Sequence, residues 1–208
     1  MPRMTRDEVK ELLISLGAVL TGHFELQSGL HSLGYLAKSY VTPDPKAVED
    51  LCYEIALQYL GRGVEAVVSP VVGAVVLGYE ISRVLTRMEG RKVFNYYAEK
   101  VPGKQDLYFG RGYYEALSGF KTLLVDDIVT TGGSLKRLKA ALPNNATVIG
   151  AGLLANRGDV TAEAVDIPEL YALATFEIPN YEPGPQACPG CREGIPLDLT
   201  FGHAGVTN

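Results

Sequence analysis

The sequence predicts an α/β protein whose mainly parallel sheet is flanked by helices. Short apolar segments without polar alternation recur along the 208 residues, which is typical of strands buried on both faces. Segments with apolar residues at helical spacing lie between several of them. Since 47% of the residues are hydrophobic, the chain can bury one sizeable core, and we expect a single domain over residues 1–208.

Two amphipathic helices are expected in the first 60 residues. Thr5 and Glu8 have the spacing of a capping box, and apolar residues follow on one helical face as far as Gly17. The second helix begins after Asp44-Pro45 and has Cys52 on its apolar face. Cys52 is therefore predicted to be a core residue.

Five buried strands are expected after the second helix. They are residues 66–68, 93–96, 123–125, 148–154 and 170–175. Apolar residues at helical spacing after Ser134 predict a helix behind the third strand. Ligands of such sheets bind at the carboxyl ends of the strands, so the residues that follow these strands are the candidates for a site.

Composition excludes several classes of partner. A net charge of -5 and a pI near 5.3 argue against a nucleic-acid groove or an anionic membrane surface. The longest apolar stretch, residues 67–77, contains Ser69, Pro70 and Gly73 and falls short of the roughly 20 residues that span a bilayer. Three cysteines do not make a secreted disulfide framework. We expect a cytoplasmic protein with reduced thiols and with neither nucleic acid nor membrane as its partner.

Residues 122–134, TLLVDDIVTTGGS, join a buried strand to a helix through two acids and a turn of hydroxyls and glycines. The carboxylates of Asp126 and Asp127 suit the vicinal hydroxyls of a ribose, since they accept hydrogen bonds and repel phosphate. The turn lies at a helix N-terminus, where free N–H groups bind phosphate and glycines allow close approach. Either half alone is as consistent with a solvated turn or a capped helix, whereas both together favour a ribose-phosphate site.

The same segment resembles the PRPP-binding signature of the type I phosphoribosyltransferases. The resemblance implies that Asp126 and Asp127 hold the ribose hydroxyls and that residues 130–134 hold the 5′-phosphate. The PRPP-binding set from this segment is Asp126, Asp127, Ile128, Val129, Thr130, Thr131, Gly132, Gly133 and Ser134. Mg²⁺ is expected to arrive with PRPP.

Residues 69–78, SPVVGAVVLG, follow the first predicted strand and open into a helix. In isolation this segment is more typical of a tight turn without a ligand. It resembles the apolar, glycine-containing pyrophosphate loop of orotate phosphoribosyltransferases. The likeness implies that the pyrophosphate is contacted by Pro70, Val71, Val72 and Gly73.

Residues 98–113 form a polar, glycine-punctuated segment that is longer than most connections. Its cations Lys100, Lys104 and Arg111 suit a lid that closes on pyrophosphate and excludes water, and the alternative is a solvated loop. A lid at this place in orotate phosphoribosyltransferases reaches the partner's active site. The resemblance implies a homodimer with catalytic roles for Lys100 and Lys104. The family's Arg-Lys start and Lys-x-His-Gly core are absent, which leaves open which lysine is essential.

Residues 22–32, GHFELQSGLHS, resemble the N-terminal orotate-site segment of the same family, and an edge strand with a turn is the alternative. Arg157 follows the strand at 148–154, where the family sets an arginine against the orotate carboxylate. The implied orotate-binding set is Arg157, Gln27, Ser28, Gly29, Lys38 and Thr130. The base site is expected beneath a hood formed by about residues 18–42 and 176–200.

The C-terminal region contains one Cys-x-x-Cys pair, Cys188 and Cys191. A zinc site needs about four ligands, and this pair with the distant His203 does not supply them. We therefore expect free thiols and no metal site made by protein side chains alone. A Cys-Pro-x-Cys tail also resembles one subgroup of orotate phosphoribosyltransferases.

The family resemblance extends from Gly22 to Leu197 and implies conversion of orotate and PRPP to orotidine 5′-monophosphate and pyrophosphate, a step of pyrimidine nucleotide synthesis. Two alternatives remain open. A purine or other phosphoribosyltransferase would share the PRPP features, and Gln27 stands where the family has a basic residue. A non-catalytic PRPP- or nucleotide-sensing regulator would keep the fold, although the acidic pI and the lack of a helix-turn-helix extension count against it.

Overall fold

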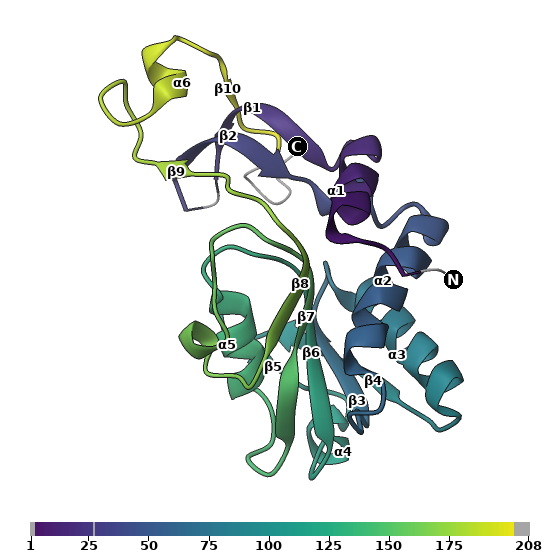
Figure 1. Cartoon of the computed structure of the whole chain (residues 1–208). Coiled ribbons are helices and arrows are strands. Elements are labelled where there is room, and N and C mark those ends of the chain that lie inside the picture. Colours follow the sequence, from purple (N-terminus) through teal and green to yellow (C-terminus); the bar gives the residue numbers. More distant parts are fainter. Residues whose placement is uncertain (1–2, 27, 202–208) are drawn as a thin grey trace.

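The computed structural model describes residues 3–26 and 28–201, and a six-stranded sheet forms its centre (Figure 1). The strand order is β5-β4-β3-β6-β7-β8, and every pairing is parallel except that of β4 with β5. The strands are β3 (Ala66–Pro70), β4 (Phe94–Lys100), β5 (Leu107–Tyr108), β6 (Lys121–Val129), β7 (Thr147–Asn156) and β8 (Leu170–Thr175). The predicted fold class is confirmed.

Helices cover both faces of this sheet (Figure 1). Leu123 and Val125 of β6 join the apolar cluster shared with the helices on one face, whereas Leu124 joins the cluster beneath the helix on the other. This alternation explains why the strand has no polar side, since both of its faces are buried. The first face carries α1 (Arg6–Ser15), α2 (Pro45–Tyr59) and α3 (Val75–Glu89), and the second carries α5 (Gly133–Ala140).

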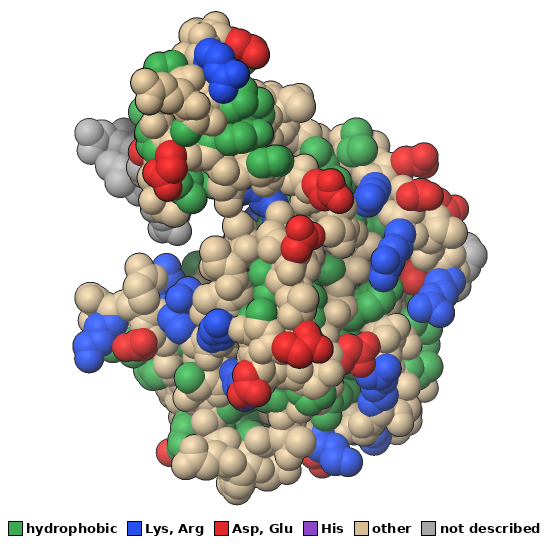
Figure 2. Space-filling view, turned by 60° about the vertical axis from the view of Figure 1, so that its left-hand side comes forward, with side chains coloured by type: hydrophobic (Ala, Val, Ile, Leu, Met, Phe, Trp, Pro, Cys, Tyr) green, Lys and Arg blue, Asp and Glu red, His purple; other side chains and the backbone are tan. Residues whose placement is uncertain are grey.

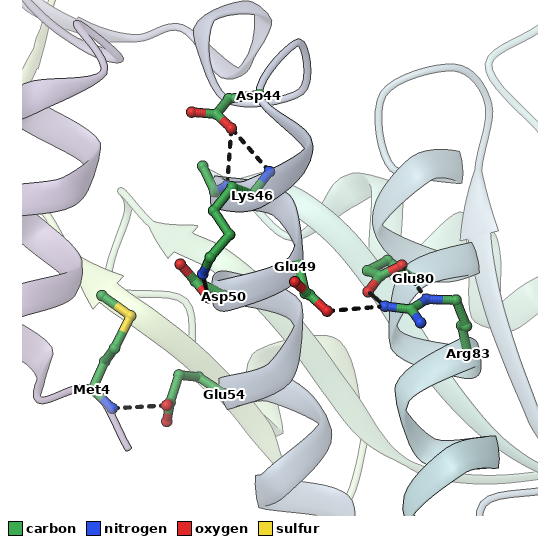
Figure 3. Close-up of polar contacts among 9 residues, drawn as sticks. Met4, Asp44, Lys46, Glu49, Asp50, Glu54, Glu80 and Arg83 are labelled. Carbon is green, nitrogen blue, oxygen red and sulfur yellow. Dashed lines mark hydrogen bonds and ion pairs between the residues drawn. The ribbon is translucent and has the colours of Figure 1, made fainter. Parts of the chain in front are cut away.

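Polar side chains cap the N-terminus of α2 and link this helix to neighbouring segments of the chain (Figure 3). The Asp44 carboxylate caps α2 by accepting hydrogen bonds from the N–H groups of Lys46 and Ala47. Buried Glu54 accepts a hydrogen bond of 2.7 Å from the Met4 backbone, which ties the chain before α1 to α2. The expected capping box of Thr5 and Glu8 also forms. Each helix of the described ranges is too short or too polar to span a membrane.

A second sheet lies above the carboxyl ends of the large sheet's strands (Figure 1). Its order is β10-β1-β2-β9, and its strands come from both ends of the chain. They are β1 (Val19–Glu25), β2 (His31–Leu36), β9 (Asn180–Tyr181) and β10 (Leu197–Asp198), with the short α6 (Pro189–Arg192) beside them. These segments fall within the two ranges expected to form a hood, and we call this sheet with α6 the hood.

The segment 98–113 contains regular secondary structure, whereas its polar, glycine-punctuated composition is typical of an irregular connection. β4 continues to Lys100 and turns back into β5, with Glu99 opposite Tyr108. The antiparallel pairing gives hydrogen-bond partners to backbone groups at the edge of the sheet. The segment is thus in part a β-hairpin, and the short α4 (Tyr113–Ala116) follows it.

Candidate active site

The two acids predicted to hold a ribose lie together near the carboxyl end of β6. Asp126 is 5% exposed and Asp127 is 7% exposed. Backbone N–H groups help to fix both carboxylates, because Asp127 N donates to Asp126 Oδ1 at 3.0 Å and Ile128 N donates to Asp127 Oδ1 at 2.6 Å. Lys38, from the 3₁₀ helix η1 (Lys38–Tyr40), forms an ion pair with Asp127. The site therefore holds two buried acids and one cation.

Burial has a strong electrostatic effect on the first acid. The pKa of Asp126 is raised to about 7, chiefly by burial and also by the neighbouring charge of Asp127. A hydrogen bond from Ser134 and the charge of Lys38 act in the opposite direction. A ligand that donates hydrogen bonds, or a cation, would favour the charged form of this carboxylate.

The turn between β6 and α5 has the geometry of an anion cradle. Gly132, at the N-cap of α5, has φ 76°, and a Cβ there would collide with Val165. A Cβ on Gly158, just beyond β7, would overlap the Thr130 carbonyl oxygen, so the turn is braced against that segment. No described side chain caps α5. Its first N–H groups are thus available to a phosphate.

The loop after β3 comes against the acid pair from the other side. A Cβ on Gly73 would overlap both the Lys38 amine and the Asp127 carboxylate. A larger residue at position 73 would have to displace these two side-chain ends. The structure thus brings the predicted pyrophosphate loop, Pro70, Val71, Val72 and Gly73, to the predicted ribose site.

Arg157 is a buried cation that lies under the hood. It is 8% exposed, and burial lowers its pKa. Its Nη2 donates hydrogen bonds to Ser32 Oγ at 2.8 Å and to Asn180 Oδ1 at 2.9 Å. Its Nε is buried without an acceptor, and no described carboxylate pairs with the guanidinium. A buried positive charge with a free donor favours an anionic ligand.

The structure shows no hydrogen bond between Arg157 and the other described residues predicted to bind the base. Ser28 and Gly29 are exposed in the turn between β1 and β2, and Gln27 lies outside the described residues. Lys38 pairs with Asp127, so in this structure it belongs to the ribose side, and its role toward the base remains a prediction. Sequence reasoning did not single out Asn180, because its contact with Arg157 arises from the pairing of β9 with β2.

The predicted lid lysines lie on the β4–β5 hairpin. Lys100 and Lys104 are exposed, and among the described residues neither side chain has an ion-pair partner. Arg111 instead pairs with Glu99 at 3.2 Å. Figure 2 shows a notch between the hood and the rest of the molecule, with basic side chains gathered on the projecting part below it. The notch leaves room for an anionic ligand to approach.

A broad hollow of about 930 Å³ lies away from these residues, at the other end of the sheet. Residues of α5 and the first residues of β7 line it, together with the 3₁₀ helix η2 (Glu163–Val165). It contains none of the predicted site residues. The charges and the anion cradle identify the candidate site better than cavity size does.

Two residues predicted to be free thiols belong to a cluster of metal-ligating type. Cys188 and Cys191 lie beside His23 and His31. His203, the third residue considered for a metal, lies outside the described residues. No sequence spacing pointed to the two histidines, since the hood's fold brings them to the cysteines.

Comparison with known families and proteins shows which family this chain belongs to. Residues 42–168 match the model of the phosphoribosyl transferase domain. The orotate phosphoribosyltransferase of Pelotomaculum thermopropionicum is 36% identical over 195 residues, which cover 93% of this chain and 95% of that protein. The orotate phosphoribosyltransferase of Chlorobium phaeobacteroides is 33% identical over 202 residues, covering 97% and 98% of the two chains.

Solved structures show the same fold. The orotate phosphoribosyltransferase of Aeropyrum pernix has a TM-score of 0.60 and 25% identity, over 80% of this chain and 93% of that one. The Mycobacterium tuberculosis orotate phosphoribosyltransferase in complex with PRPP has a TM-score of 0.58 and 18% identity, over 82% and 89% of the two chains. A yeast adenine phosphoribosyltransferase has a TM-score of 0.54 and 16% identity, over 72% and 96%.

Proposed function

Because this chain belongs to the phosphoribosyl transferase family and, within it, to the orotate phosphoribosyltransferases, we propose that it converts orotate and PRPP to orotidine 5′-monophosphate and pyrophosphate. The main support within the chain is Arg157. A buried guanidinium with a free Nε and no acidic partner among the described residues suits the carboxylate that distinguishes orotate from uracil. A purine offers no such group, so this observation favours orotate over the purine alternative.

The PRPP half of the site follows from the acids and the turn. Asp126 and Asp127 accept hydrogen bonds from the ribose 2′ and 3′ hydroxyls, and the turn at 130–134 binds the 5′-phosphate through N–H groups and hydroxyls. The loop at 70–73 contacts the pyrophosphate. Lys38 balances the charge of Asp127 beside it.

The chemistry needs no protein nucleophile. The bond from C1 to pyrophosphate loosens before the orotate nitrogen attacks, so positive charge grows on the ribose and negative charge grows on the leaving group. Asp126 and Asp127 orient the ribose and favour its developing positive charge. Two buried carboxylates, one with a raised pKa, also form an oxygen donor set that suits Mg²⁺ near the ribose hydroxyls. When bound, the ion supplies positive charge to the departing pyrophosphate.

A panel of bases tests this assignment. Orotate, uracil, adenine, hypoxanthine and xanthine are each mixed with PRPP and Mg²⁺, and nucleotide formation is followed by absorbance. We expect turnover of orotate and little of uracil, which would leave Arg157 unpaired. Turnover of a purine with none of orotate would overturn the base assignment and leave the transferase assignment standing. Tight PRPP binding without turnover of any base would favour a regulator.

We further propose a homodimer in the cytoplasm, in which each hairpin serves the partner's site. Lys100 and Lys104 are exposed and have no ion-pair partner among the described residues, and exposed Val72, Val76 and Tyr79 give the molecule an apolar face. Lys100→Ala and Lys104→Ala should mainly lower kcat, because their charge acts on the leaving group.

Hybrid dimers test the shared site. Mixing a hairpin mutant with an Asp126→Asn mutant should restore part of the activity, since one site of the hybrid would have both an intact hairpin and an intact acid pair. No recovery after confirmed subunit exchange would count against sharing.

A further inference from the structure

Four side chains of the hood converge on one point. The ligating atoms of His23, His31, Cys188 and Cys191 all lie within 4.8 Å of one another. His23 Nε2 is 2.9 Å from His31 Nδ1, 3.3 Å from Cys188 Sγ and 3.7 Å from Cys191 Sγ. One ring nitrogen makes a single in-plane hydrogen bond, so it does not satisfy three such neighbours. An ion bound at the centre of the four ligand atoms explains why the other three lie around this nitrogen.

The spacings approach those of a tetrahedral site. Zn–S bonds of about 2.3 Å and Zn–N bonds of about 2.0 Å at tetrahedral angles separate the ligand atoms by roughly 3.3–3.8 Å. Cys191 Sγ is also 3.2 Å from His31 Nδ1, and all three cysteines of the chain are free of disulfides. Two thiolates and two imidazoles form the ligand set that selects zinc among the common cellular divalent ions.

The surroundings hold the ligands in place. His23 is 3% exposed and Cys188 is fully buried, which limits access of water. The other ring nitrogen of His23, Nδ1, lies 2.8 Å from the Ile195 carbonyl oxygen, and donating its proton there leaves Nε2 free for a metal. Gly190, between the cysteines, leaves room for the imidazole, because a Cβ there would lie 2.7 Å from His23 Cδ2.

We propose that His23, His31, Cys188 and Cys191 bind one Zn²⁺ ion with a structural role. Four protein ligands leave no open position for substrate, which is typical of structural zinc sites. Binding requires both thiols in the thiolate form, so the two protons pass to solvent. The site joins β1 and β2, near the N-terminus, to α6, near the C-terminus.

The hood has a physical need for such a crosslink. The two apolar clusters of the described residues include no side chain from β2, β9, α6 or β10. The hood's own apolar packing is small, with Phe24, Tyr35 and Phe201 in ring contact. A subdomain with so small a core commonly depends on a metal or disulfide for its stability. Metal binding free energy then adds to the apolar burial.

The metal would also position the base site. His31 directly precedes Ser32, whose hydroxyl accepts a hydrogen bond from Arg157, and β9 pairs with β2 at the same two residues. His31 thus acts on orotate through Ser32 as a positioning residue. This consequence rests on the proposed function, whereas the metal site itself does not.

Metal content tests the proposal directly. The full chain, produced without a histidine tag and kept reduced, is analysed by inductively coupled plasma mass spectrometry. We expect about one zinc per chain in the wild type and a loss of most of it in Cys188→Ser and in His23→Gln. Cys52→Ala removes the cysteine outside the cluster and should keep the zinc, which makes it the matched control.

A second measurement keeps the test valid if those variants do not fold. The wild-type chain is stripped with a chelator and titrated with Co²⁺, and the visible absorption of tetrahedral thiolate-bound cobalt is recorded. That spectrum, its displacement by Zn²⁺ and a lower Tm after stripping would support the site. Failure of the wild type to bind either ion, or a Cys188–Cys191 disulfide in freshly isolated protein, would overturn it. Orotate turnover by a protein that binds no zinc would reject the metal site alone, and zinc binding without turnover would reject the proposed function alone.

Discussion

The large sheet and the hood support the two halves of the candidate site in different ways. Asp126 and Asp127 lie on a central strand with apolar clusters on both faces, so the core of the protein fixes them. Arg157 depends on single hydrogen bonds to Ser32 and Asn180 from the hood. The difference indicates that PRPP binding should survive perturbation of the hood, whereas recognition of the base should not.

The largest effect is expected from the acid pair. Replacing both Asp126 and Asp127 by Asn keeps the shape but removes the charge facing the ribose. Each lost charge-assisted hydrogen bond is worth about 1.5–3 kcal/mol, so kcat/KM should fall by at least about two decades while circular dichroism stays native. Asp166→Asn, at an exposed ion pair with Lys139, is the control. A double mutant with a tenth of wild-type activity would refute the ribose assignment.

The next largest effect distinguishes recognition of the base from binding of PRPP. Arg157→Ala should raise the KM for orotate by about thirtyfold or more, since truncating one partner of a buried charge pair costs about 2–5 kcal/mol, and the KM for PRPP should change little. Steady-state kinetics with each substrate varied in turn measures both. Arg62→Ala, which removes a partly exposed arginine paired with Glu169, is the control. Equal rises in both KM values would contradict the separation.

Removal of the metal should raise the KM for orotate as Arg157→Ala does, but by a smaller factor. Stripping zinc from the wild type should loosen β2 and raise the KM for orotate by roughly tenfold, because the hydrogen bond from Arg157 to Ser32 that it weakens is worth about 1.5 kcal/mol. The KM for PRPP should stay within about twofold, because the buried core holds the acid pair. Restored kinetics after zinc is added back would exclude irreversible damage. A matching rise for PRPP would show that the two halves are not independent.

The last prediction concerns the stability of the fold and its dependence on pH. Because the pKa of Asp126 is raised from 3.8 to about 7, the folded protein keeps a proton in this pH range that the unfolded chain has lost. Unfolding releases that proton, so the Asp126 contribution to the free energy of unfolding should fall as pH rises from about 4 to 7. Urea unfolding of wild type and Asp126→Asn at several pH values measures it. The wild type should lose more stability than the mutant, and parallel profiles would contradict the shift.

The amino-acid sequence by itself determined the fold class and the local arrangement of residues 122–134, to which we assign the PRPP half of the site. The strand, the acids, the glycine turn and the helix at 122–134 are contiguous, so local patterning was enough to predict the arrangement that the structure shows. The predicted strands were confirmed, four of them with more residues than predicted and the last, 170–175, with the same bounds, since burial on both faces leaves a continuous apolar segment.

Tertiary structure alone decided how the hood is held together. His23 and Cys188 are 165 positions apart, and they meet only because β10 pairs with β1 and places α6 beside β2. The contact of Arg157 with Asn180 likewise depends on the register of β9 against β2. The raised pKa of Asp126 comes chiefly from burial, which only the folded chain provides. Contacts of this kind are set by packing between distant segments, and no local pattern of residues encodes them.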